Sequence, residues 1–201
     1  MTSHKKMRIL AKQTEVYLDI ETSSLDADSG MVVAVGYATG NGKPKILFVE
    51  SFNDEKSVIS DIFEMTKDKE IITFNGSRFD IPFLIARGLK YGLYLPKIET
   101  IDLYCWARKF LKLQSRRFHE ICLFYDIPHE EISGKEVNEL FIKAMSGAHD
   151  AKQRIVDHLN QDIEALQAFY KKIKPLLANY PPPDCLTDDR SVSNKWRARA
   201  R

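Results

Sequence analysis

Two carboxylates lie two positions apart in the segment VYLDIET, and they are the first residues whose spacing could do chemistry. An extended strand would point the side chains of Asp19 and Glu21 to the same face. At roughly 7 Å apart by strand rise, two carboxylates repel each other unless a cation or water lies between them. For this D-x-E pair alone, the alternative is that the two acids simply mark the point where a strand ends in a polar loop.

Three further residues extend this set. Asp80 follows the Asn-Gly turn of TFNGSRFDIPFL and precedes a helical pattern, where an ordinary N-cap is the alternative role. His158 and Asp162 lie four residues apart in HLNQD, so they share one helix face. The apolar residues around them predict that both point along the seam between this helix and the sheet. The alternative is an i,i+4 pair that contributes only a few tenths of a kcal/mol.

Apolar periodicity predicts the elements that would position these residues. Strands are expected at 15–23, 31–40, 45–51, 71–76 and 99–104. Helices are expected at 54–68, 79–92, 115–127, 133–145 and 150–177. Ser133 and Glu136 have the spacing of a capping box, and Asp150 with Gln153 has a variant of it.

This order of elements predicts an α/β protein. Its mixed five-stranded sheet would have three antiparallel strands followed by β-α-β crossovers, with helices flanking the sheet. The fourth strand should lie beside the first, which would bring Asp80 to the same end of the sheet as Asp19.

Charge is distributed unevenly along the 201 residues, although the net charge is only +2. Residues 1–12 carry +4 and residues 190–201 carry +5, which leaves the body of the chain at −7. We expect a basic N-terminal segment at 1–13, one domain at 14–180 and a flexible basic tail at 181–201. Such ends suit contact with a polyanion, and solubilising disorder is the alternative.

Composition sets the expected location. With 44% hydrophobic and 29% charged residues, the chain is typical of a globular domain, and it has no apolar run of about 18 residues for a membrane span. The basic N-terminus leads into no apolar signal region, so a cytoplasmic location is expected. The three cysteines, Cys105, Cys122 and Cys185, are odd in number and widely spaced. They fit a reducing compartment and argue against a disulfide framework or a zinc knuckle.

Taken together, the motifs resemble those of the DEDD superfamily of 3′–5′ exonucleases. VYLDIETSS is similar to the first motif, and HLNQD lies where the third is expected. FNGSRFDIPFL resembles the second motif, above all that of the proofreading domain of family B DNA polymerases. The resemblance covers about residues 14–175. ISGKEV extends it to small stand-alone bacterial and archaeal relatives of that domain. The implied fold is ribonuclease H-like.

The resemblance implies a metal-dependent 3′–5′ exonuclease that hydrolyses single-stranded nucleic acid to 5′-mononucleotides, with DNA favoured over RNA. Two Mg²⁺ or Mn²⁺ ions would be its cofactors. Asp19 would bridge both ions, Glu21 and Asp162 would complete the first, and Asp80 would help to hold the second. Within these 201 residues we expect no polymerase domain.

A further residue must orient or deprotonate the attacking water. Members of the superfamily use either Tyr four residues before the last Asp or His five before it. Here His158 lies four residues before Asp162. A position five residues before would point about 140° away on a regular helix. We therefore hypothesise that His158 occupies the tyrosine position and accepts a proton near pH 7.

Residues that could contact the substrate are less sharply defined. Asn75 belongs to the second motif, with support of the Asn-Gly turn as its alternative role. Phe79 could stack on a base. Five cations within ten residues could follow a phosphate backbone or form a solvated helix face: Arg108, Lys109, Lys112, Arg116 and Arg117. Lys135 is a further candidate.

The expected partner is the 3′ end of single-stranded DNA or RNA, with no membrane partner. The sequence leaves the oligomeric state open, with a monomer as one option. Two competing interpretations remain. One is a catalytically silent nucleic-acid-binding module of the same fold, and the other is an ordinary α/β domain in which the motifs coincide.

Overall fold

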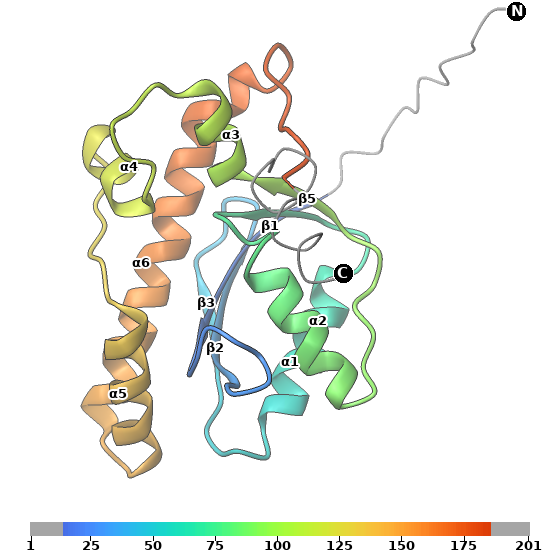
Figure 1. Ribbon diagram of the computed structural model, residues 1–201, viewed down its shortest axis with the longest axis vertical. Coiled ribbons are helices and arrows are strands. Elements are labelled where there is room, and N and C mark those ends of the chain that lie inside the picture. Colours follow the sequence, from blue (N-terminus) through green and yellow to red (C-terminus); the bar gives the residue numbers. More distant parts are fainter. Residues whose placement is uncertain (1–13, 186–201) are drawn as a thin grey trace, which may run out of the picture.

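The computed structural model describes residues 14–185 of the chain. Residues 1–13, the predicted basic N-terminal segment, lie outside the described residues, as does the part of the predicted tail at 186–201. The described residues form one sheet with helices on both faces (Figure 1).

The sheet has the predicted mixed topology. Its strands are β1 Glu15–Thr22, β2 Val32–Thr39, β3 Lys45–Phe48, β4 Glu70–Thr73 and β5 Glu99–Asp102. They lie in the order β3-β2-β1-β4-β5. The pairs β1–β2 and β2–β3 are antiparallel, whereas β1–β4 and β4–β5 are parallel. The predicted fold class and the placement of the fourth strand beside the first are therefore confirmed.

Six α-helices and one short 3₁₀ helix surround the sheet in the described part of the chain. They are α1 Glu55–Thr66, α2 Asp80–Lys90, α3 Leu103–Phe110, α4 Phe118–Phe124, α5 Gly134–Met145, α6 His149–Ile173 and η1 Lys174–Leu176. None of them is both long enough and apolar enough to cross a membrane.

Alternation along β1 divides the core into two halves. Val16, Leu18 and Ile20 pack against α1 and α2 on one face. Tyr17 points to the opposite face, where α3, α4 and α6 cover the sheet. In Figure 1, α6 runs along one side of the sheet, and α1 and α2 lie on the other. Asp19 and Glu21 have the same parity as Tyr17, so they point toward the α6 side.

A glycine allows α6 to approach the sheet closely beside Asp19. Gly36 on β2 is the register partner of Asp19. A Cβ at Gly36 would lie 3.0 Å from Ile163 and 3.3 Å from Leu159 on α6. A larger residue here would push the helix away from the sheet, so this glycine helps to bring the α6 side chains to β1.

Two local expectations need correction. The α3 helix was not among the predicted elements, because β5 runs into it without a loop; Asp102 caps it by accepting the Tyr104 and Cys105 N–H groups. The predicted capping role of Asp150 is wrong. Helix α6 starts one residue earlier after a tight turn at Gly147 (φ 95°), and it has no side-chain cap. Ser133 does cap α5 as predicted, by accepting the Glu136 N–H at 3.2 Å.

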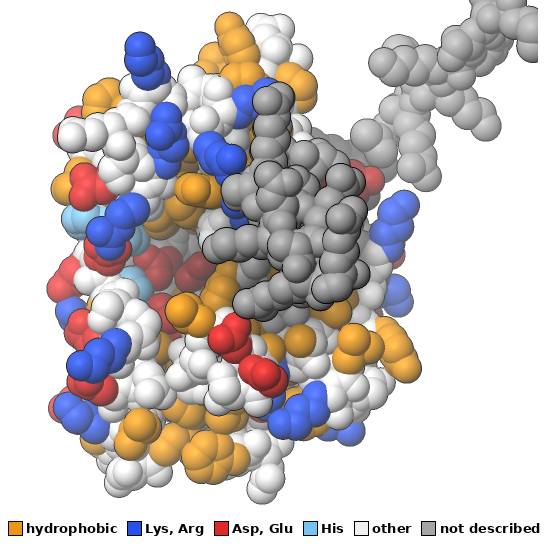
Figure 2. Space-filling model, in the orientation of Figure 1, with side chains coloured by type: hydrophobic (Ala, Val, Ile, Leu, Met, Phe, Trp, Pro, Cys, Tyr) orange, Lys and Arg blue, Asp and Glu red, His pale blue; other side chains and the backbone are white. Residues whose placement is uncertain are grey.

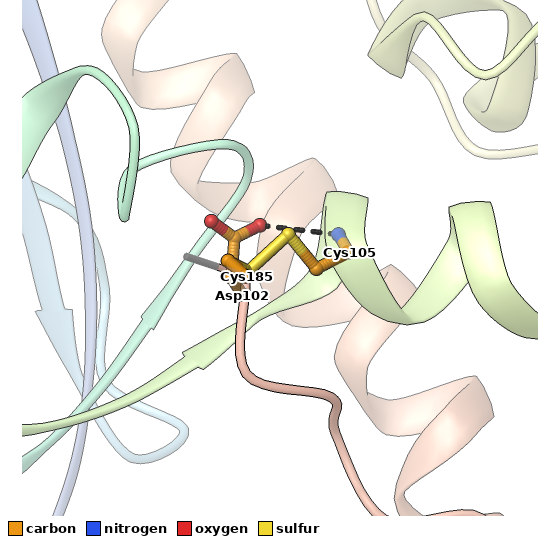
Figure 3. A group of neighbouring side chains, drawn as sticks. All are labelled: Asp102, Cys105 and Cys185. Carbon is orange, nitrogen blue, oxygen red and sulfur yellow. Dashed lines mark hydrogen bonds between the residues drawn. A yellow bond between two sulfur atoms is a disulfide. The ribbon is translucent and has the colours of Figure 1, made fainter. Parts of the chain in front are cut away.

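The C-terminal end of the described chain returns to the start of α3. Cys185 forms a disulfide with Cys105, 80 residues earlier, and both lie beside Asp102 (Figure 3). The Trp106 indole N–H also donates to the Tyr180 carbonyl at 2.8 Å. The prediction that the cysteines argue against a disulfide is therefore wrong. Their spacing in the sequence did not reveal that the chain folds back on itself; Cys122 alone remains a free thiol.

Removing this disulfide should destabilise the protein measurably. We expect Cys185→Ser to lower the free energy of unfolding by about 2–4 kcal/mol, because the unfolded chain would regain the freedom of a long loop. Urea denaturation without reductant measures the change. Reductant should lower the stability of the wild-type protein to that of the variant and leave the variant unaffected. Equal stability of the oxidised wild type and the variant would contradict the prediction.

Candidate metal-dependent active site

Asp80 reaches β1 from the turn between β4 and α2. Strand β4 pairs with β1 only along Glu15–Tyr17. Beyond this point the Ile20 N–H donates to Asp80 Oδ1 at 3.1 Å. Asp80 is the first residue of α2 rather than its N-cap. It therefore lies beside β1 at the level of Asp19 and Glu21, as the sequence predicted.

The turn that carries Asp80 is held by another carboxylate. Asp102 accepts the Asn75 N–H at 2.9 Å and the Ser77 N–H at 3.0 Å. Asn75 has φ 65°, a left-handed conformation that asparagine tolerates better than most residues. The backbone of Asn75 thus supports the turn, which was its alternative role. A contact with substrate stays a prediction.

Helix α6 supplies the other two predicted residues from the facing side. His158 and Asp162 are both buried, each with 8% of its surface exposed. The His158 Nε2 lies 3.3 Å from Glu21 Oε1 and 3.2 Å from Asp162 Oδ2. His158 therefore bridges β1 and α6, and the structure brings together all five residues proposed for the chemistry.

Three acids of this cluster, Asp19, Glu21 and Asp80, have raised pKa values. Burial, together with the charges of Asp80, Asp162 and Glu21, raises the pKa of Asp19 well above its usual value. Burial also raises the pKa of Glu21, although the contact with His158 opposes this. Burial raises the pKa of Asp80 to about 7, even though it accepts backbone N–H groups. Such crowding of acids is costly without a neutralising cation.

The neighbouring carboxylates favour the protonated form of His158. Burial by itself lowers the pKa of its imidazole, but the hydrogen bond to Glu21 and the charge of Asp162 outweigh it, so the net pKa is raised. The other ring nitrogen, Nδ1, is buried and has no hydrogen-bond partner among the described residues. The basicity of His158 therefore resides at Nε2, which faces the carboxylates.

Two further histidines adjoin the site, and the sequence analysis missed both. His129, in the connection between α4 and α5, places Nε2 2.7 Å from Asp162 Oδ1. Its Nδ1 lies 3.3 Å from the Nδ1 of His119. Neither residue belongs to a motif or has a telling spacing from Asp162. Only their residue type could have singled them out.

These groups border a hollow on the molecular surface. In Figure 2, acidic and histidine side chains gather in a recess of the visible face. The cavity has a volume of about 200 Å³ and combines charged with aromatic side chains. Its lining includes Asp19, Phe74, Phe118, His119, His129, His158 and Asp162. It offers carboxylates beside flat apolar surfaces.

The predicted substrate contacts divide into two groups. Phe79 and Lys135 line a second cavity together with Glu21, so they lie next to the acidic cluster. The basic stretch lines neither cavity: Arg108, Lys109, Lys112, Arg116 and Arg117. Arg117 is paired with Glu131, and the Arg116 guanidinium lies 3.5 Å from the Leu111 carbonyl. Contact of these five cations with a phosphate backbone stays a prediction.

Comparison with known proteins supports the relationship suggested by the motifs. The model of the RNase H superfamily matches residues 16–174. The uncharacterized protein MJ0365 of Methanocaldococcus jannaschii is 29% identical over 163 residues, which cover 77% of this chain and 92% of that protein. A DNA polymerase of Pyrococcus glycovorans is 28% identical over 109 residues, which cover 48% of this chain and 13% of the polymerase.

Solved structures share the fold. The family B DNA polymerase of Pyrobaculum calidifontis superimposes with a TM-score of 0.72 and 17% identity, over 85% of this chain and 26% of the polymerase. E. coli Exonuclease I, solved in complex with a dT13 oligonucleotide, gives a TM-score of 0.60 and 16% identity, over 84% of this chain and 43% of that chain. The similarity thus spans only a minor part of these larger proteins.

Proposed function

Because the chain belongs to the RNase H superfamily, we propose that it is a metal-dependent 3′–5′ exonuclease that hydrolyses single-stranded nucleic acid to 5′-mononucleotides. The observation that carries this proposal is the convergence of four carboxylates from β1, α2 and α6 in one cluster, with Asp19 and Asp162 lining the cavity beside it. Buried acids with raised pKa values are a costly arrangement for structure alone, and they are typical of sites that bind metal and catalyse reactions.

The donor atoms fit divalent cations. One ligand atom each from Glu21, His158 and Asp162 lies within 4.8 Å of the others. Carboxylate oxygens suit Mg²⁺ or Mn²⁺. Asp19, Glu21 and Asp162 would hold one ion, and Asp19 with Asp80 would hold a second. When bound, the ions would supply a water of lowered pKa and stabilise negative charge on the leaving 3′ oxygen.

His158 is the proposed acceptor of the water's proton. Its Nε2 faces Glu21 and Asp162 across 3.3 and 3.2 Å, so a water held at these carboxylates would be within its reach. A neutral imidazole accepts a proton near pH 7, which a tyrosine in the same position does poorly. This role rests on the spacing from Asp162 and on the direction of Nε2.

We favour single-stranded DNA over RNA as the substrate. Exonuclease I, which shares the fold, was solved in complex with a dT13 oligonucleotide, and several relatives are DNA polymerases. Phe79 would stack on a base beside the scissile phosphate, and Lys135 would attract the phosphate backbone. Asn75 would contact the terminal nucleotide.

A strand-polarity assay tests the proposal. Single-stranded DNA and RNA of one sequence, labelled at either the 5′ or the 3′ end, are incubated with the protein in Mg²⁺, Mn²⁺ or EDTA. With metal, the 5′ label should remain on a ladder of shortening strands, and the 3′ label should leave at once as a mononucleotide. EDTA should abolish both signals. A 5′ label released first, or cleavage that persists in EDTA, would contradict the proposal.

Two variants sharpen this assay. His158→Ala should slow hydrolysis by about 10²–10⁴-fold, the usual contribution of a general base. His149→Ala removes an exposed histidine from the first turn of the same helix and should leave the rate unchanged. Full activity of His158→Ala would remove its catalytic role. Binding of single strands without any cleavage would favour the catalytically silent module.

A further inference from the structure

Two histidines, the half-buried His119 and His129 with its buried side chain, connect in series to Asp162. His119 contacts His129 through the two Nδ1 atoms at 3.3 Å, and His129 contacts Asp162 Oδ1 through Nε2 at 2.7 Å. The His129 side chain has only 4% of its surface exposed. Its ring also meets Phe118 edge-to-face, with the centroids 5.0 Å apart. Both nitrogens and the ring plane of His129 are therefore fixed.

The protonation of each group determines which side chain donates and which accepts in this series of hydrogen bonds. An ionised carboxylate only accepts, so the proton between His129 and Asp162 is carried by Nε2 of the histidine. The Nδ1 of a neutral His129 is then an acceptor, and His119 must donate to it. The order of donation runs from His119 to His129 to Asp162, and it uses one oxygen of the carboxylate.

The second oxygen of Asp162 is directed by this contact. The terminal torsion of an aspartate is broad, so its carboxylate rotates unless a partner holds it. With Oδ1 bound to His129, Oδ2 faces the site and lies 3.2 Å from His158 Nε2. Without His129, repulsion from the neighbouring acids would favour rotation of Asp162 away from them.

We propose that His129 is a positioning residue that holds the Asp162 carboxylate in the orientation that binds a divalent cation. This inference rests on the proposed function, since it assigns Asp162 to the metal site. Partners of this kind, which orient a metal ligand without touching the metal, commonly change metal affinity by 10–100-fold. His129 would thus act through Asp162 rather than on the substrate.

Binding of Mn²⁺ to the full chain measures this role without any substrate. Free Mn²⁺ is followed by electron paramagnetic resonance during titration of the wild-type protein, His129→Leu, His129→Gln and His149→Gln. We expect His129→Leu to weaken binding by about 10–100-fold. His129→Gln should recover most of the affinity, because its amide N–H can occupy the place of Nε2. His149→Gln, altered at an exposed position of α6, should match the wild type.

The outcomes separate the two proposals. Mn²⁺ affinity of His129→Leu within twofold of the wild type would overturn the positioning role, and so would equal losses in the Leu and Gln variants. Thermal melting in EDTA would show whether either variant is misfolded. If His129→Leu melts early, its Mn²⁺ affinity would be set aside and only His129→Gln would be compared with the wild type. Dependence of Mn²⁺ binding on His129 in a protein that degrades no nucleic acid would support the inference while defeating the proposed exonuclease. A wild-type protein that binds no Mn²⁺ would defeat both.

Discussion

Asp19→Asn is expected to abolish hydrolysis and, at the same time, to stabilise the metal-free protein. Asp19 is the carboxylate whose pKa is raised by burial and by three neighbouring acids, so its charge is unfavourable without a cation. Loss of a ligand shared by two ions should lower the rate by at least about 10³-fold, which corresponds to about 4 kcal/mol of transition-state stabilisation. Nuclease assays and thermal melts in EDTA measure the two effects.

The pH dependence has a definite sign. An acid with a raised pKa in the folded state stabilises the fold at low pH, and that contribution is lost as the pH rises through the folded-state pKa. The metal-free wild type should therefore lose stability from about pH 4 upward, through about pH 7 for Asp80. Asp19→Asn should lose less, and added Mn²⁺ should stabilise it less than the wild type.

Asp28→Asn provides a matched control for this variant. It removes an acid from an exposed position in the connection after β1. We expect wild-type activity, an unchanged melting profile in EDTA and normal stabilisation by Mn²⁺. A stable, active Asp19→Asn protein would show that Asp19 is not a metal ligand of the reaction.

The second large effect concerns a buried ion pair that joins Glu55 of α1 to Arg87 of α2. Arg87 donates to both carboxylate oxygens of Glu55, at 2.8 and 2.5 Å. Glu55 also accepts the Val32 N–H at 2.8 Å and the Tyr91 hydroxyl at 2.5 Å. Burial opposes ionisation of Glu55, but the Arg87 and Tyr91 hydrogen bonds outweigh it and lower the pKa of Glu55.

Arg87→Met should lower the free energy of unfolding by about 3–5 kcal/mol, because it leaves Glu55 buried and without its cation. Urea denaturation at pH 7 measures the change. Arg154→Met breaks the exposed pair with Glu130 and should have little effect. Similar stabilities of the two variants would show that the buried pair does not hold the two helices. Arg87→Met with Glu55→Gln should recover part of the loss.

Local patterns could predict much of the site because its positions follow from two periodicities. Alternation along β1 placed Asp19 and Glu21 on one face, and helical spacing placed His158 with Asp162. The parallel pairing of β4 with β1, which is confirmed, brings the turn before Asp80 to the same end of the sheet. Each step required only local geometry and one rule of topology.

Contacts between residues far apart in the sequence could not be predicted in this way, because they depend on the path of the connecting segments. His129 meets Asp162 because the connection after α4 lines the cavity, and no periodicity in the sequence predicts that path. The Cys105–Cys185 disulfide likewise depends on where the chain returns after α6. The Glu55–Arg87 pair depends on how α1 and α2 lie together on the sheet. The spacing of these residues in the sequence does not predict that they are in contact.

The start of α3 is a different case, because its signal was present in the sequence. Asp102 directly precedes an amphipathic segment and accepts two N–H groups of the first turn. The prediction of a strand through Tyr104 hid this cap. Asp102 also holds the turn before Asp80 through Asn75 and Ser77. One carboxylate outside the acidic cluster thus links the end of β5 to the second motif.

Anomalous diffraction from crystals grown with Mn²⁺ and a 5′-mononucleotide would locate the proposed metal ions in the acidic cluster. We predict two peaks, roughly 3.5–4 Å apart, between Asp19, Glu21, Asp80 and Asp162, with the nucleotide phosphate against them. Well-ordered crystals with both ligands at saturating concentration and no peak at these carboxylates would contradict the account. Peaks confined to another group of side chains would contradict it equally.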